Sequence, residues 1–196
     1  SCNTAIELSG AFNKVIRTKI GSPYVIEGIQ RALAAGSSTV VGFEANGGLI
    51  LGSAIRKNDK ALAELMTRDA VLPILVLLVL AKTKRCKLSE LLHDLPKRFT
   101  ASDRLQSFSQ EASRLVLAKL ESSIESARSF FCDLGLLPAS IDQTDGMRVL
   151  MKNGEIVHFR QSGNAPELRC YAEAAEQGRA NWLVKESLRL ISQYKN

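Results

Sequence analysis

An apolar run from Ala70 to Ala81 constrains the fold of this chain more than any other stretch of the sequence. It contains Pro73 and is shorter than the roughly 20 residues that a membrane-spanning helix needs, so no transmembrane segment is expected. A helix that is apolar on every side has to be covered, and a sheet is the expected partner of this one. Amphipathic periodicity precedes the run, which predicts one helix over residues 60–82.

The residues before this run predict the other parts of an α/β domain. Ser22 is a good N-cap and Pro23 a favoured first helical residue, and we expect the helix that they begin to end at Gly36. Residues 39–43 and 49–51 are short aliphatic runs with a glycine-rich turn between them. They predict two strands joined by that turn.

A change of pattern near Pro96 divides the chain into a first domain, residues 1–95, and a second domain, residues 96–196. An Asn-Gly pair at residues 153–154 is a strong hairpin signal between two apolar runs. The expected elements of the second domain are a strand at 98–105, a long helix at 110–131, strands at 147–151, 156–159 and 167–171, and a helix at 177–194. This order predicts an antiparallel sheet covered by helices.

The formal net charge of +6 is compatible with an anionic ligand. Long basic runs are missing and aromatic residues, 6% of the chain, are not interleaved with basic ones, so nucleic acid is not an expected partner. Cys2, Cys86, Cys132 and Cys170 lack the spacing of a zinc site or a disulfide framework, and we expect this chain to bind no metal. Without a signal-peptide pattern, the expected location is cytoplasmic.

The stretch from Arg160 to Arg169 concentrates groups that bind anions. Its two arginines have the donor geometry that matches phosphate, and Ser162 can donate a hydroxyl. Gly163 lets backbone N–H groups approach a ligand, and Asn164 tolerates a left-handed conformation. Two interpretations remain open, a phosphate-binding turn and a polar hairpin loop with two surface arginines.

A second turn, from Gly42 to Gly48, sets Glu44 and Asn46 two residues apart, on the same side of an extended segment. A carboxylate and an amide so placed can hold neighbouring hydroxyl groups of a sugar, and Gly47 allows close approach. The alternative is an ordinary glycine-rich hairpin.

Lys19 and Ser22 lie at the start of the first expected helix, whose N-terminus could receive an anion. Capping of the helix by Ser22 is the alternative. His93 and His158 have no nucleophile or carboxylate at motif spacing, so both are predicted to be structural.

Five motifs follow one another along the chain: Ser1-Cys-Asn-Thr-Ala-Ile-Glu, Arg17-Thr-Lys-Ile-Gly-Ser-Pro-Tyr-Val-Ile, Gly42-Phe-Glu-Ala-Asn-Gly-Gly, Thr144-Asp-Gly-Met-Arg-Val, and Arg160 to Arg169 with Cys170-Tyr171. In this order they resemble the third and fourth domains of the α-D-phosphohexomutase family, the bacterial phosphomannomutases and phosphoglucomutases. The resemblance runs nearly end to end. It implies a three-layer α/β/α domain, followed by a smaller antiparallel-sheet domain covered by helices, which is similar to the TATA-binding protein.

The resemblance also implies a hexose phosphate as the ligand. Glu44 and Asn46, with Gly47 beside them, would contact sugar hydroxyls. The phosphate that is not transferred would be surrounded by Arg160, Ser162, Gly163, Asn164 and Arg169. The full-length parent would interconvert hexose 1-phosphate and hexose 6-phosphate through a phosphoserine enzyme and a bisphosphorylated sugar, with Mg²⁺ as its cofactor.

The family's phosphoserine loop and magnesium-binding aspartate loop lie in its first two domains. This sequence has no Asp-x-Asp-x-Asp cluster and no Ser-His-Asn triplet. We therefore expect a C-terminal fragment that has no catalytic residues of its own and is inactive without the N-terminal domains of the same protein. The alternative is a noncatalytic sugar-phosphate-binding module that is complete as it stands.

Overall fold

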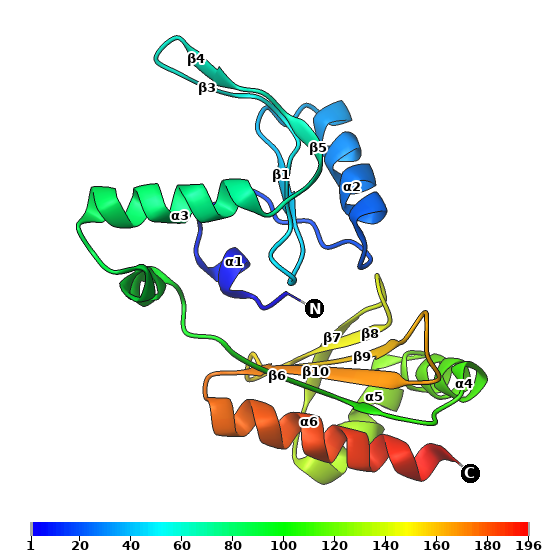
Figure 1. Ribbon diagram of the computed structural model, residues 1–196. Helices are drawn as coiled ribbons and strands as arrows, with labels where there is room; N and C mark the ends of the chain where they lie inside the picture. Colours follow the sequence, from blue (N-terminus) through cyan, green and yellow to red (C-terminus); the bar gives the residue numbers. More distant parts are fainter. Residues whose placement is uncertain (1, 196) are drawn as a thin grey trace. The chain divides into compact units, whose positions relative to one another are not determined.

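The structure is a computed structural model that describes residues 2–195, with residue 195 described by its backbone alone. Ser1, which opens the first of the five motifs, lies outside the described residues. The chain divides into two compact units, one that runs from Thr4 to Pro96 with Cys2, and one that starts at Lys97 (Figure 1). Among the described helices, none combines the length and the apolar character needed to cross a bilayer.

The first unit is built on a small antiparallel sheet in the order β1-β2-β5. One helix, α2, covers this sheet through Val25 and Ile29, which form a core with Ile50. Its elements are α1 (Ala5–Leu8), α2 (Ser22–Ala34), β1 (Val41–Phe43), β2 (Leu49–Leu51), the separate hairpin of β3 (Ile55–Lys57) and β4 (Lys60–Leu62), β5 (Leu65–Asp69), α3 (Val71–Lys84) and the 3₁₀ helix η1 (Leu88–Asp94). The helix and the two strands expected before residue 60 are therefore confirmed.

Gly42 and Gly52 let α2 approach the sheet closely. A Cβ on Gly42 would lie 2.3 Å from Cγ1 of Val25, and a Cβ on Gly52 would lie 2.3 Å from Cγ2 of Ile29. Gly42 opens the motif that was expected to hold a sugar. Its own requirement for glycine comes from packing, because any side chain there would displace the core of this unit.

The expectation of one helix over residues 60–82 is wrong for its first half. Residues 60–62 and 65–69 form β4 and β5, and β5 pairs with β2 so that Leu65 lies opposite Leu51. Asp69, the last residue of β5, stabilises the first turn of α3, because its Oδ1 accepts hydrogen bonds from the backbone N–H groups of Val71 and Leu72, at 2.7 and 3.2 Å. Pairing with a distant strand has overridden the local helical periodicity.

The expected burial of the apolar helix is also wrong for the described part of the chain. Most of the large apolar side chains of α3 stay open to solvent, with Val71 62% and Val79 64% exposed. The exposed apolar residues between them are Ile74, Leu75, Val76, Leu77 and Leu78. The core of the small sheet is formed with α2, and within the described unit α3 contributes no residue to it.

The second unit is a five-stranded antiparallel sheet in the order β6-β10-β9-β8-β7, with its helices packed together in one hydrophobic core (Figure 1). Its elements are β6 (Phe99–Leu105), α4 (Gln110–Leu120), α5 (Ile124–Phe131), η2 (Cys132–Leu134), β7 (Pro138–Asp142), β8 (Met147–Met151), β9 (Ile156–Gln161), β10 (Leu168–Ala174), α6 (Gln177–Ser192) and η3 (Gln193–Lys195). The mixed α/β class with antiparallel sheets is therefore confirmed.

Two details of this unit differ from the expectation. The long helix at 110–131 is divided at residues 121–123, where the Ser123 hydroxyl caps α5 by accepting a hydrogen bond from the backbone N–H of Ser126. Strand β7 was not expected, because residues 138–142 carry too few β-branched side chains to indicate a strand.

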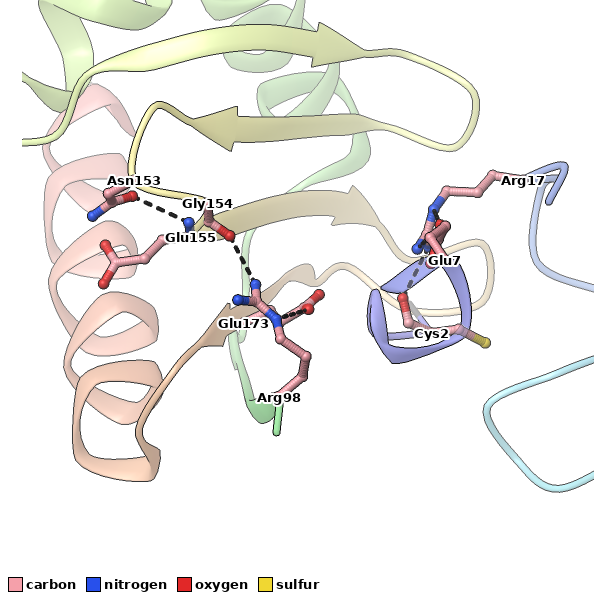
Figure 2. Close-up of polar contacts among 8 residues, drawn as sticks. All are labelled: Cys2, Glu7, Arg17, Arg98, Asn153, Gly154, Glu155 and Glu173. Atoms are coloured by element: carbon pink, nitrogen blue, oxygen red, sulfur yellow. Dashed lines mark hydrogen bonds and ion pairs between the residues drawn. The ribbon is translucent and has the colours of Figure 1, made fainter. Parts of the chain in front are cut away.

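Ion pairs hold the ends of both units (Figure 2). Arg98, the residue before β6, pairs through Nε with Glu173 of β10 and donates from Nη2 to the Gly154 carbonyl at 2.8 Å. In the first unit, Arg17 donates to Glu7 Oε1 at 2.6 Å and to the Cys2 carbonyl at 2.9 Å. Arg17 opens the second motif, and in this structure it holds the N-terminal segment in place.

Replacing Arg98 with Met is expected to destabilise the second unit by about 3–5 kcal/mol, because it removes the guanidinium that pairs with the Glu173 carboxylate, which is only 5% exposed. Urea unfolding followed by the fluorescence of Trp182, the single tryptophan, measures this unit. Arg189→Met is the matched control, since Arg189 pairs at the surface with Glu186 and should contribute less than about 1 kcal/mol. If both variants lose the same free energy of unfolding, the Arg98–Glu173 pair does not stabilise this unit more than a surface pair does.

His158 of β9 is buried, as expected of a structural histidine. Its Nε2 lies 2.7 Å from the carbonyl oxygen of Asp145, and since a carbonyl only accepts, Nε2 carries the proton. Burial lowers the pKa of His158 to about 4, and the hydrogen bond to Asp145 opposes this shift only in part.

Between pH 6.5 and 4 the unfolded chain therefore binds a proton at His158 that the folded chain does not. As the pH is lowered through this window, the free energy of unfolding is expected to decrease, with His158 contributing up to about 1.4 kcal/mol per pH unit. Urea titrations of His158→Gln should lack that part of the fall, whereas His93→Gln, at an exposed position, should keep it. Parallel profiles for all three proteins would show that His158 does not contribute.

Candidate phosphate and sugar sites

The segment from Arg160 to Arg169 is the hairpin between β9 and β10. The backbone N–H of Ser162 donates to the Glu167 carbonyl at 3.0 Å and closes the loop. Ser162 itself is only 2% exposed, while Gly163 and Asn164 are exposed at the tip. Backbone groups at the tip are therefore the part of the loop that a ligand can reach most directly.

The pairing of β9 with β10 sets Arg160 directly opposite Arg169. Side chains of opposite residues lie on the same face of a sheet, with Cβ atoms about 5 Å apart. We call this face, which carries Arg160 and Arg169, the arginine face. The neighbouring residues Leu168 and Cys170 are fully buried on the other face, in the core of the unit.

The pairing of β10 with β6 adds Arg104 to this row, opposite Arg169. Sequence reasoning did not identify Arg104 as a site residue. Alternation along 98–105 could have placed its side chain on one face of a strand, but only the pairing of the strands shows that this face is shared with the hairpin arginines.

Two carboxylates lie beside the arginines. Asp145 Oδ2 is 2.8 Å from Nε of Arg160, and both side chains are about one-fifth exposed. The Nε–H bond does not point at this oxygen, so within the described residues Nε makes an ion pair but no hydrogen bond. Glu167 lies between Arg104 and Arg169, at 3.4 Å from the first and 3.7 Å from the second.

In the sequence, Asp145 stands out only as a member of the fourth motif, with no role of its own. Its backbone is held by two contacts with β9, the hydrogen bond from His158 and the close approach of Gly146. Gly146 has φ +87°, and a Cβ there would lie 2.4 Å from the carbonyl oxygen of Phe159, so only glycine fits. The carboxylate of Asp145 is thereby kept beside Arg160.

The turn that was expected to contact a sugar is a closed hairpin between β1 and β2. The N–H of Glu44 donates to the Gly48 carbonyl at 2.9 Å, and the N–H of Gly47, with φ +89°, donates back to the Glu44 carbonyl at 3.0 Å. Asn46 Oδ1 accepts from the N–H of Gly48 at 3.0 Å. The amide oxygen of Asn46 thus supports the turn, and its NH₂ group is the part suited to a ligand.

Glu44 is oriented by α2, the helix that begins within the second motif. The hydroxyl of Ser22 donates to Glu44 Oε1 at 2.7 Å. The expectation that Ser22 caps the helix is wrong, because Gly21 is the N-cap residue and Ser22 is the first residue of α2. Lys19 lies with Nζ 5.9 Å from the ring centroid of Tyr24, and the structure does not test whether it contacts an anion.

Arg68 of β5 is a second residue that sequence reasoning missed. Its side chain lies against Gly48, where a Cβ would be 2.3 Å from Cδ of Arg68. The sugar turn and the phosphate loop belong to different units, so the structure brings Ser22, Glu44 and Arg68 together in one unit and the three arginines together in the other.

Two sequence profiles match this chain. Residues 1–99 match "Phosphoglucomutase/phosphomannomutase, alpha/beta/alpha domain III", and residues 84–189 match "Phosphoglucomutase/phosphomannomutase, C-terminal domain". A phosphomannomutase of Salmonella muenchen is 44% identical over 191 residues, which are 96% of this chain and 39% of that protein. A phosphomannomutase of Sinorhizobium fredii is 38% identical over 192 residues, 97% of this chain and 40% of that protein.

Solved structures of Aspergillus fumigatus N-acetylphosphoglucosamine mutase share the fold. One has a TM-score of 0.58 and 16% identity, and covers 91% of this chain and 34% of its own. The other, a complex with GlcNAc-6P and magnesium, has a TM-score of 0.53 and 17% identity, and covers 89% of this chain and 36% of its own.

This chain thus spans about two fifths of the length of the phosphomannomutases that it matches. The two profiles follow each other in the order of its two compact units, and together they leave only the last residues unmatched. The chain belongs to the phosphoglucomutase/phosphomannomutase family.

Proposed function

We propose that this chain is the substrate-binding C-terminal part of a phosphohexomutase that interconverts hexose 1-phosphate and hexose 6-phosphate. The observation that carries the proposal is the direct pairing of Arg160 with Arg169. Like charges opposite each other in a sheet repel. A phosphate group bound between the two guanidiniums would replace this repulsion with charge-assisted hydrogen bonds.

The tip of the same loop would complete the phosphate site. Gly163 and Asn164 are exposed, and their backbone N–H groups could donate to phosphate oxygens. Ser162 is buried, so its hydroxyl is less accessible to a ligand than the backbone groups of the tip. The relatives' names and the GlcNAc-6P complex of a protein with this fold support a hexose phosphate as the ligand class.

The turn with Glu44 and Asn46 would hold the sugar ring. Ser22 fixes one carboxylate oxygen of Glu44, which leaves the carboxylate in a defined orientation toward hydroxyl groups. The first domain expected from the sequence, residues 1–95, would then be the sugar-binding domain and the second, residues 96–196, the phosphate-binding domain.

The parent would carry out phosphoryl transfer through a phosphoserine and a bisphosphorylated sugar, with Mg²⁺ to neutralise charge. The described residues contain no group of three or more His, Cys, Asp or Glu side chains that could hold a metal, so we assign no step through the metal to this chain. The contribution of its own residues is to bind and orient the sugar phosphate. Alone, the chain should be inactive as a mutase.

The apolar surface of α3 supports the proposal that the chain works within a longer protein. A run of large apolar side chains, each about half exposed, is unusual for the surface of a complete soluble domain. Burying such a side chain contributes about 1.5–3 kcal/mol, so a covering segment would stabilise this unit substantially.

In the longer parent, Arg160→Ala is expected to weaken the binding of mannose 6-phosphate about tenfold or more, because a hydrogen bond to a charged group contributes about 1.5–3 kcal/mol. Isothermal titration of the parent measures the dissociation constant. Arg189→Ala, an exposed position on α6, is the control and should bind like the wild type. An unchanged affinity in Arg160→Ala would contradict the assignment of the loop to phosphate.

Glu44→Gln is expected to change the preference of the parent between mannose phosphate and glucose phosphate, while the affinity for inorganic phosphate stays the same. The carboxylate accepts hydrogen bonds that an amide cannot reproduce, whereas it has no role in holding phosphate. Competition titrations with the two sugar phosphates and with phosphate separate these effects. If Glu44→Gln loses affinity for all three ligands equally because it is unfolded, the turn has a structural role only.

A further inference from the structure

The arginine face carries a third guanidinium that no motif of the sequence includes. Arg104 of β6 lies opposite Arg169 of β10, whose other neighbour is Arg160 of β9. The three side chains therefore form one row across three adjacent strands. Their exposed fractions rise along the row, from 18% for Arg160 to 38% for Arg169 and 50% for Arg104.

The charges in this row are not balanced. Three guanidiniums are accompanied by two carboxylates, Asp145 and Glu167. The distances from Glu167 to Arg104 and Arg169, 3.4 and 3.7 Å, are longer than those of charge-assisted hydrogen bonds. Within the described residues, Glu167 Oε2 is buried without a hydrogen-bond partner. Among the described residues, the row thus carries one more positive than negative charge, and the contacts of Glu167 leave its donors loosely held.

Backbone contacts keep Arg104 at a fixed place relative to the hairpin loop. The N–H of Phe108, just beyond β6, donates to the Pro166 carbonyl at 2.9 Å. Phe108 is 1% exposed in the core, so this hydrogen bond anchors the loop to the strand that carries Arg104. The side chain of Arg104 can therefore act together with the loop rather than as an independent surface charge.

We propose that Arg104 is a further phosphate-binding residue, which acts with Arg160 and Arg169 on the phosphate group of a phosphate monoester. Glu167 lies beside Arg104 and Arg169 and keeps both guanidiniums near the loop before the ligand binds. This inference rests on the proposed function, since it concerns the same ligand and the same loop. A phosphate dianion placed on the row gains a third guanidinium as hydrogen-bond donor, and its negative charge more than offsets the excess positive charge.

The test uses the 196-residue chain and inorganic phosphate at constant ionic strength. Isothermal titration compares the wild type with Arg104→Gln, Arg104→Lys and Arg114→Gln. Arg114 is exposed on α4 of the same unit, so its replacement makes the same change in net charge away from the arginine face. We expect about tenfold weaker binding in Arg104→Gln, partial recovery in Arg104→Lys and less than a twofold change in Arg114→Gln.

A second measurement follows the Nε–Hε signals of the arginines by NMR during the phosphate titration. The signal of Arg104 should shift together with those of Arg160 and Arg169, which a purely structural pairing with Glu167 would not produce. Trp182 fluorescence checks the folding of each variant. If Arg104→Gln is unfolded, the NMR titration of the wild type and the phosphate affinity of Arg104→Lys show whether Arg104 binds phosphate.

The outcomes separate this inference from the proposed function. If phosphate binding is lost in Arg160→Ala but unchanged in Arg104→Gln, with a static Arg104 signal, Arg104 serves only as the partner of Glu167 and the inference is overturned. The proposed function would stand in that case. If the wild-type chain binds neither phosphate nor mannose 6-phosphate, both are overturned.

Discussion

The pairing of β10 with its two neighbours is the constraint on which the second unit depends. It sets Arg169 between Arg160 and Arg104 at one end of the sheet. At the other end of the same strand, Glu173 is paired with Arg98 and buried. One strand face therefore carries a satisfied ion pair and an unbalanced arginine row, and a shift of one residue would turn both sets of charges toward the hydrophobic core.

The first unit depends on a different kind of constraint, a close contact between one helix and a small sheet. Glycines at 42 and 52 bring α2 against the strands, and the Ser22 hydroxyl on that helix reaches Glu44 in the hairpin. The sugar turn is thus oriented from the helix. This core is small, and the apolar side chains of α3 stay outside it. The unit has more apolar surface to bury than the described residues can cover.

Much of the site could be predicted from local signals. The hairpin at residues 153–154, the strands that flank the phosphate loop and the helix after Ser22 each depend on turn residues and short-range periodicity, and the structure contains all of them. The family followed from five motifs in a fixed order, and two sequence profiles agree with it. Errors arose where local periodicity competed with pairing, as in β5, and where a cap residue found a better partner, as for Ser22.

The sequence by itself determined the element types, the loop with its arginines and the family, because turn chemistry and side-chain periodicity act over a few neighbouring residues. Only the tertiary structure decided that Arg104 shares a face with Arg169, that Asp145 lies beside Arg160, and that the described residues leave the apolar helix exposed. These depend on strand register and packing between residues far apart in the chain. Such contacts follow from the free energy of the whole fold, and no local pattern of residues encodes them.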